Sequence, residues 1–129
     1  MAQYADIIEI VAPGEAQAGS RIDITVRVKN NHSAAIGIMV GGALEYGVSP
    51  WPGISLPEPS ANVDSGVTYS FIGYFTMPDK KVTIHAYSYW YGADGYWYFD
   101  DEMTKVINPA AAIESQFGSI EIVSYERRL

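Results

Sequence analysis

Apolar and polar residues alternate with a period of two along most of this chain, which is the pattern of β-strands with one buried and one solvated face. The clearest stretch is residues 20–30, where the alternation is unbroken: Ile22, Ile24, Val26 and Val28 against Asp23, Thr25, Arg27 and Lys29. Similar stretches, bounded by turn-forming residues, predict further strands. These strands cover residues 6–11, 35–46, 66–76, 82–91, 96–107 and 118–125.

Residues 49–60 contain four prolines, at positions 50, 52, 57 and 59, and they break this pattern. Proline has no N–H group and fixes φ, so a segment this rich in proline is excluded from the centre of a sheet. We therefore expect the segment to lie at the surface, as an irregular connection or as an edge strand.

Only residues 108–116 have helical character, because Pro109 suits a first helical turn and three alanines follow it. About eight strands with one short C-terminal helical connector predict an all-β fold, and an antiparallel β-sandwich is preferred over a small barrel. The sandwich is expected over residues 1–107. Residues 108–129 then form a connector and an extra strand, packed on the same domain or on a neighbouring subunit.

Several stretches resemble the immunoglobulin-like β-sandwich. They are Ala18-Gly19-Ser20 leading into residues 22–30, then residues 69–78, Val82-Thr83-Ile84, and later Trp97, Asp100 and Asp101. Together they span about residues 7 to 107 and are similar to domains of cell-surface proteins, including bacterial CARDB-type adhesion modules, and of virion structural proteins. The resemblance implies the sandwich fold and no catalytic residues, and it ends at Asn108.

Charge and composition exclude several classes of function. Fifteen acidic residues against eight basic ones give a formal net charge of −7, so we expect no nucleic-acid partner. The chain has no cysteine, which excludes thiol catalysis, Cys-ligated metal centres and disulfides. No apolar run approaches the roughly 20 residues that span a bilayer, and the first residues do not resemble a signal peptide. We expect no membrane insertion and no cleaved leader.

Candidate catalytic and metal-binding residues are few. His32 and His85 lie far apart, with no nucleophile-elbow motif and no third metal ligand near either. Residues 100–102 are three adjacent acidic residues on an expected strand, and neighbouring strand residues point to opposite faces, so we do not expect them to flank one glycosidic bond. With Asp94 they form either a cation site or a solvated acidic rim. We expect no enzyme activity and no cofactor.

Aromatic residues concentrate in one predicted hairpin, formed by residues 82–91 and 96–107 around a Gly92-Ala93-Asp94-Gly95 turn. Alternation places them on both faces of the hairpin. They either pair across the strands to stabilise the hairpin or form a contact surface, because Tyr and Trp combine apolar area with a polar tip. Sugar binding is a further use, since aromatic rings stack on pyranose rings. The candidate interface or ligand residues are Trp51, Tyr87, Tyr89, Trp90, Tyr91, Tyr96, Trp97 and Tyr98.

The last predicted strand, residues 118–125, needs a partner strand. It can lie against an edge of its own domain, or it can cross to a neighbouring copy by β-augmentation. Two arginines follow it and would meet an acidic body, and complementary charge of this kind steers association. The candidate residues of this assembly tail are Ile120, Ile122, Tyr125, Arg127 and Arg128.

These features favour a non-enzymatic structural protein that works by self-association. We expect a homo-oligomer or an assembly with other subunits, either in a virion, as a capsid, decoration or tail protein, or on an extracellular surface. A missing leader on a fold used mostly outside cells favours the virion. Two alternatives remain: a carbohydrate-binding module that uses the Tyr/Trp hairpin to bind a glycan, and a small enzyme with an unrecognised site.

Overall fold

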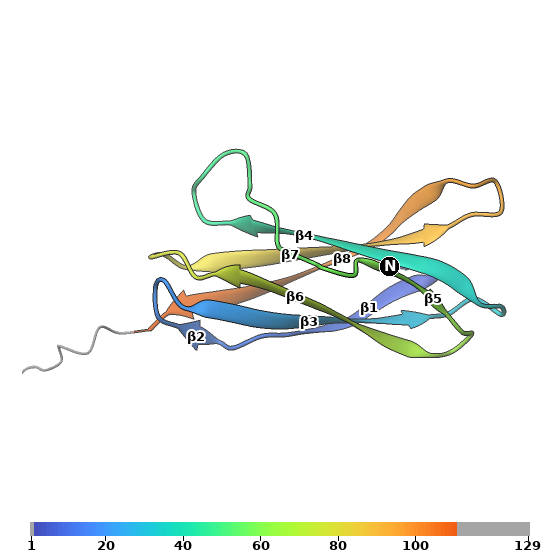
Figure 1. Ribbon diagram of the computed structural model, residues 1–129, viewed down its shortest axis with the longest axis horizontal. Helices are drawn as coiled ribbons and strands as arrows, with labels where there is room; N and C mark the ends of the chain where they lie inside the picture. Colours follow the sequence, from blue (N-terminus) through green and yellow to red (C-terminus); the bar gives the residue numbers. More distant parts are fainter. Residues whose placement is uncertain (1, 111–129) are drawn as a thin grey trace, which may run out of the picture.

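The computed structural model describes residues 2–110, which form two β-sheets packed face to face (Figure 1). One sheet has three strands in the order β1-β3-β6, and the other has five in the order β2-β8-β7-β4-β5. The strands are β1 Ala5–Val11, β2 Glu15–Ala16, β3 Arg21–Asn30, β4 Ile36–Glu45, β5 Ser60–Val63, β6 Thr68–Thr76, β7 Val82–Tyr91 and β8 Trp97–Pro109. All neighbours are antiparallel except β2 and β8. The described residues contain no helix. The predicted all-β, immunoglobulin-like sandwich is confirmed.

The inward positions of the alternating strands build the core between the sheets. On β3 the predicted alternation is confirmed, because its four β-branched apolar side chains are buried while the residues between them face outward. Phe71 of β6 adds to this layer from the same sheet, and β4 and β7 supply facing side chains such as Ile38 and Ile84. Burial of this continuous apolar layer is the main favourable term in folding.

The strand boundaries differ from the predicted ones in three places. Sequence patterns missed β2, a two-residue strand that pairs with the end of β8, and β5, a four-residue strand beside β4. Strand β8 continues through Asn108 to Pro109, so these two residues belong to the sandwich. Residues 111–116 of the expected helical connector and the expected strand over residues 118–125 lie outside the described residues.

The proline-rich segment is irregular, as predicted, and it covers the side of the sandwich between β4 and β6. Two isolated bridges join it to the sheets, from Gly53 to Ala43 on β4 and from Ser55 to Tyr74 on β6. Between these bridges the side chain of Ile54 enters the core and is only 9% exposed. The segment therefore links the two sheets and contributes to the core.

Candidate functional site

The outer face of the five-stranded sheet carries a row of aromatic side chains, which we call the aromatic face: Trp51, Tyr87, Tyr89, Tyr91, Trp97 and Phe99. Cross-strand register explains the row, because Tyr89 lies opposite Phe99 and Tyr91 lies opposite Trp97 in the β7–β8 pairing. The ring centroids of these two pairs are 5.8 and 5.0 Å apart, both in edge-to-face arrangement. Tyr87 contacts the same Phe99 ring at 6.3 Å.

A second aromatic column lies on the opposite face of the same hairpin. Trp90 stacks on Tyr98 at a centroid distance of 5.0 Å and meets the edge of Tyr4 at 4.8 Å. Tyr4 in turn contacts His32, in the turn between β3 and β4, at 4.5 Å. The prediction that both hairpin faces are aromatic is therefore confirmed, and this column connects the hairpin to the N-terminal strand.

His85 lies near the middle of the aromatic face between two glutamates. Its Nε2 is 2.8 Å from Glu45 on β4 and its Nδ1 is 3.0 Å from Glu102 on β8. Trp51 stacks on the imidazole at a centroid distance of 4.4 Å, and the ring of Tyr87 lies nearly parallel to it at 6.4 Å. Burial lowers the pKa of His85, but the hydrogen bonds and charges of the two glutamates outweigh it and raise the pKa above its usual value.

This cluster attaches the proline-rich segment to the aromatic face. Trp51 belongs to that segment, and its stacking on His85 places an indole ring over the outer sheet surface. The side chain of His85 is 12% exposed, whereas both glutamates are almost half exposed. Burial together with the tyrosine and glutamate neighbours raises the pKa of Tyr87. The arrangement positions Trp51 and offers no free histidine for acid–base chemistry.

The tip of the hairpin is the most exposed part of the candidate surface. Tyr96 is 68% exposed. The hydroxyl of Tyr98 donates a hydrogen bond to Asp94, which lowers the pKa of Asp94 and raises that of Tyr98. Asp94 also accepts from the backbone N–H of Tyr96. Asp94 therefore serves the turn, as its Asp-Gly sequence predicted.

The predicted site residues thus divide between two surfaces. Trp51, Tyr87, Tyr89, Tyr91 and Trp97 lie on the aromatic face, where Tyr87 and Tyr89 are half-buried and the other three are exposed. Trp90 and Tyr98 belong to the second column, on the other face. The predicted tail residues, Ile120, Ile122, Tyr125, Arg127 and Arg128, lie outside the described residues.

A hollow of about 320 Å³ adjoins the aromatic face at the hairpin end of β4. Tyr91 and Trp97 form its aromatic side, and Ser60 and Asn62 of β5 supply a hydroxyl and an amide. Gly37 lies at its base, where a Cβ atom would be 3.1 Å from the Cβ of Tyr91 and 3.4 Å from the Trp97 ring. The glycine therefore permits the close approach of both aromatic rings.

The acidic residues 100–102 do not alternate between faces as predicted. The β7–β8 register shifts between Ser88 and Tyr89, so the extra residue Asp100 forms a β-bulge. As a result Asp100 and Asp101 both point towards β1, and Glu102 points outward to His85. The expectation that neighbouring carboxylates face opposite ways is wrong here, because a bulge interrupts the pleat.

Both aspartates accept hydrogen bonds from the backbone of the N-terminal strand. Asp100 accepts from the N–H groups of Gln3, Tyr4 and Ala5 at 2.5, 2.8 and 2.6 Å. Asp101 accepts from Ile7 N–H at 3.0 Å. The residues that the structure describes contain no group of three or more acidic or histidine side chains placed to hold a metal ion.

Sequence reasoning missed this cross-sheet contact and one further partner in it. The hydroxyl of Ser88 is fully buried and donates to the carbonyl oxygen of Ala5 at 2.6 Å. The sequence does indicate that Ser88 needs a hydrogen-bond acceptor, because it occupies an inward position between Ala86 and Trp90 and buried hydroxyls require a partner. Its partner lies 83 residues away in the chain, so the sequence alone does not identify it.

Comparisons with known proteins identify the fold. No protein-family model and no curated protein matches the chain. Among solved structures, the CARDB domain of a Pyrococcus furiosus protein, in complex with di-metal ions, is 11% identical, with a TM-score of 0.58 over 85% of this chain and 92% of that one. The PKD domain of an M14-like peptidase from a Thermoplasmatales archaeon is 14% identical, with a TM-score of 0.51 over 86% and 100%.

A third similar structure belongs to a larger protein. It is the alkylpurine DNA glycosylase AlkC of Pseudomonas fluorescens bound to DNA, 13% identical with a TM-score of 0.60. The match covers 84% of this chain but only 31% of the glycosylase chain. At these identities the likeness establishes the immunoglobulin-like β-sandwich, a fold that serves proteins of varied function. No helix in the described part of the chain is long and apolar enough to cross a membrane.

Proposed function

We propose that this protein is a non-enzymatic sandwich subunit that works by self-association, in a virion or in an extracellular surface assembly. The observation that carries the proposal is the aromatic face, which places exposed Tyr, Trp and Phe side chains on a continuous antiparallel sheet. Large aromatic side chains are enriched at the centres of protein interfaces, and their rigidity limits the entropy lost on binding. The partner surface is a second copy or another subunit of the assembly.

The chemistry of the polar residues supports a non-enzymatic role. Asp100 and Asp101 already accept backbone hydrogen bonds, and Asp94 accepts from Tyr98. His85 is held between two glutamates under Trp51. In each case the group is used within the fold, whereas a catalytic acid or base needs access to a substrate.

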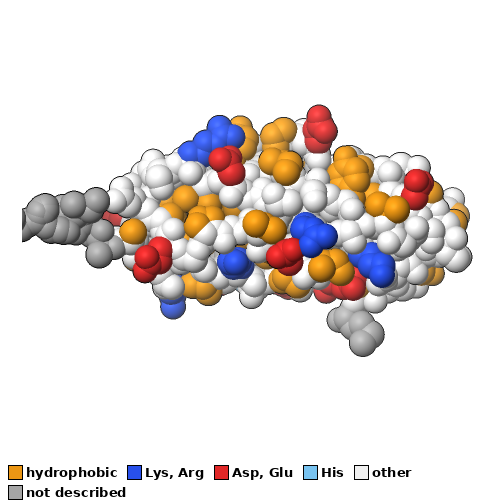
Figure 2. Space-filling view, turned by 90° about the horizontal axis from the view of Figure 1, so that it is seen from below, with side chains coloured by type: hydrophobic (Ala, Val, Ile, Leu, Met, Phe, Trp, Pro, Cys, Tyr) orange, Lys and Arg blue, Asp and Glu red, His pale blue; other side chains and the backbone are white. Residues whose placement is uncertain are grey.

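The opposite outer face has a different character and supports the choice of surface. On the three-stranded sheet, Arg27 pairs with Glu9 at 2.6 Å and Arg21 pairs with Asp23 at 3.0 Å. Figure 2, which views the molecule from below Figure 1, shows acidic and basic side chains lying side by side among separate hydrophobic ones. Such a mixed surface is typical of a solvated face.

Light scattering at several protein concentrations tests the proposal, because self-association must raise the average mass with concentration. Replacing Tyr91 and Phe99 with Ser should weaken association at least about tenfold and leave a folded monomer. Ile8→Ser with Val11→Ser is the matched control, because these residues are similarly exposed but lie on the other sheet. A monomer at every concentration would refute self-association, and turnover of a substrate would favour the small enzyme.

Carbohydrate binding is the second candidate function, and the hollow beside Trp97 favours it. An aromatic side next to the Ser60 hydroxyl and the Asn62 amide is suited to stacking on a pyranose ring and bonding its hydroxyls. Glycan-array binding that disappears in Trp97→Ala and persists in Trp90→Ala would support this function at this hollow. Binding that is insensitive to Trp97 would contradict it.

A further inference from the structure

Strand β6 has a free edge in the part of the chain that the structure describes. Its one strand partner is β3, and on its other side Ser55 bonds both backbone groups of Tyr74. In an antiparallel pair, every second residue directs its backbone N–H and C=O groups away from the partner strand. Ile72, Ser70 and Thr68 therefore direct these groups away from β3, to the same side as Tyr74. These groups have no partner among residues 2–110.

Other sheet edges are partly covered or short, although β2 pairs with only the last two residues of β8. On the first half of β1, carboxylates and the Ser88 hydroxyl occupy backbone groups from Gln3 to Ile7. Strands β2 and β5 contain two and four residues. An unpaired edge with a regular row of donors and acceptors is a site for strand addition, and the stretch from Thr68 to Ile72 combines such an edge with an adjacent pocket.

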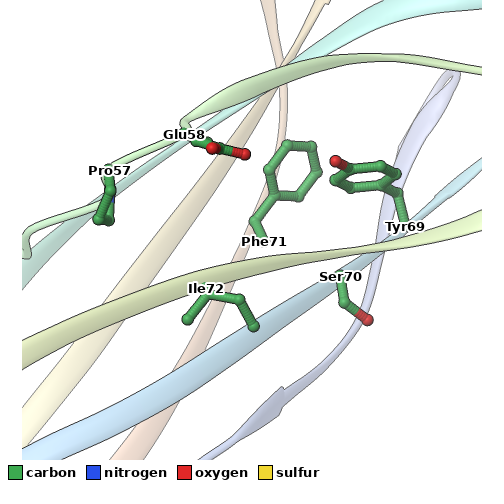
Figure 3. A pocket seen from close by; sticks show the side chains of 6 residues that line it. All are labelled: Pro57, Glu58, Tyr69, Ser70, Phe71 and Ile72. Carbon is green, nitrogen blue, oxygen red and sulfur yellow. The ribbon is translucent and has the colours of Figure 1, made fainter.

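An apolar pocket of about 310 Å³ opens beside this free edge. Pro57 and Glu58 line one side of it, and β6 lines the other with Tyr69, Ser70, Phe71 and Ile72. Figure 3 shows the rings of Tyr69 and Phe71 on the Pro57–Glu58 side of β6, and Ile72 and Ser70 on the opposite side. A strand added along β6 would therefore place its inward side chains in this pocket.

We propose that the free edge of β6 receives residues 118–125 of a neighbouring copy of this chain. Ile120 and Ile122 are separated by Glu121 in that segment, so in an added strand both would share one face and suit the apolar pocket. Glu58 at the rim supplies a charge partner for Arg127 or Arg128, which follow the segment. The inference rests on the proposed self-association and adds to the aromatic face a second contact, at the edge of the three-stranded sheet.

The position of the last described residues favours a neighbouring copy over the same chain. The N–H of Ala110 bonds the carbonyl of Ala16 at the end of the sandwich where Gly19 bonds Met77, just past the end of β6. A segment that continued from there along its own β6 would first meet Ser55, which occupies the edge at Tyr74. A neighbouring copy can present its segment directly to Ser70 and Ile72.

Cross-linking between single-cysteine variants tests the contact, because the natural chain has no cysteine. Ser70→Cys and Val123→Cys copies are mixed and treated with a short bis-maleimide. We expect a covalent dimer of one copy of each kind, and at least about fivefold less product when Asp79→Cys, on an exposed turn, replaces Ser70→Cys. No dimer above that control overturns the proposal. Efficient cross-linking within one chain that carries both cysteines, at high dilution, also overturns it.

A second variant separates this inference from the proposed function. Ser70→Pro removes one outward N–H without removing a bond to β3, whereas Ser70→Thr keeps the N–H. We expect Ser70→Pro to weaken self-association at least about fivefold, measured by light scattering, and Ser70→Thr to leave it unchanged. Unchanged association in a folded Ser70→Pro protein overturns the β6 site but leaves self-association standing. A natural protein that is monomeric throughout overturns both, and if Ser70→Pro does not fold, the cross-linking result decides.

Discussion

Removing the Asp100 carboxylate should destabilise the fold by releasing the N-terminal strand. In Asp100→Ala, the N–H groups of Gln3, Tyr4 and Ala5 lose an acceptor that lies 2.5–2.8 Å away. Asp100 lies at a bulge, so no neighbouring carboxylate takes over these contacts: Asp101 is already bonded to Ile7. The substitution therefore tests whether the bulge attaches β1 to the five-stranded sheet.

The expected loss follows from the surroundings of the three donors. A hydrogen bond to a charged group contributes about 1.5–3 kcal/mol, and a buried donor without a partner costs about 1–3 kcal/mol. The bond from Gln3 is exposed, so water replaces it, whereas the bonds from Tyr4 and Ala5 are partly buried. The two partly buried hydrogen bonds, from Tyr4 and Ala5, share one carboxylate, so we expect their loss to lower the free energy of unfolding by about 2–3 kcal/mol.

Urea unfolding followed by tryptophan fluorescence measures this loss, since Trp90 contacts Tyr4 directly. Amide hydrogen exchange should also accelerate at Tyr4 and Ala5. Asp79→Ala is the control, because Asp79 is an exposed aspartate in a turn, and its effect should stay within about 0.5 kcal/mol. An Asp100→Ala protein as stable as this control, with unchanged exchange at Ala5, would show that the contacts do not stabilise β1.

Three further predictions concern the proline-rich segment and the cluster beneath Trp51. Because the pKa of His85 is raised, its contribution to the free energy of unfolding is complete below the ordinary histidine pKa of 6.5 and is lost as pH rises through the raised value. Urea unfolding at several pH values measures this dependence, and Glu102→Gln should make it weaker. Gly73→Ala would place a Cβ atom 2.9 Å from a backbone oxygen of the segment, and thermal unfolding should show a loss of about 1–3 kcal/mol in stability. Gly14→Ala is the control and should be near neutral, because no atom lies within 4 Å of the added Cβ. Ile54→Ala should cost about 2–4 kcal/mol in the same assay, and a loss below about 1 kcal/mol would remove Ile54 from the core.

The regular part of the fold was predictable because alternation is a local property of the chain. The inward residues of β3 and β7 follow from the period of two alone, as do the two aromatic faces of the hairpin. Strand β2 was not predictable, because two residues are too few to show a period, and their pairing with Asn108 and Pro109 is a long-range contact. The same limit applies to β5.

The candidate site was predictable in composition but not in arrangement. Which aromatic residues share a face depends on the register of β7 against β8, and that register changes at the Asp100 bulge. Two adjacent aspartates in a strand carry no local signal of a bulge. The stacking of Trp51 on His85 joins residues 34 positions apart, so it depends on how the proline-rich segment folds back over β4.

The aromatic residues of the hairpin lie on two faces, where they have different neighbours. Trp90 stacks on Tyr98 and meets the edge of Tyr4, so this column joins the hairpin to the residue that precedes β1. Tyr91 and Trp97 pair with each other on the outer face and remain exposed there. Trp90 is partly buried against the core, so the first set contributes to the stability of the hairpin. The second set remains exposed, so it is available for the contact with another molecule that we propose.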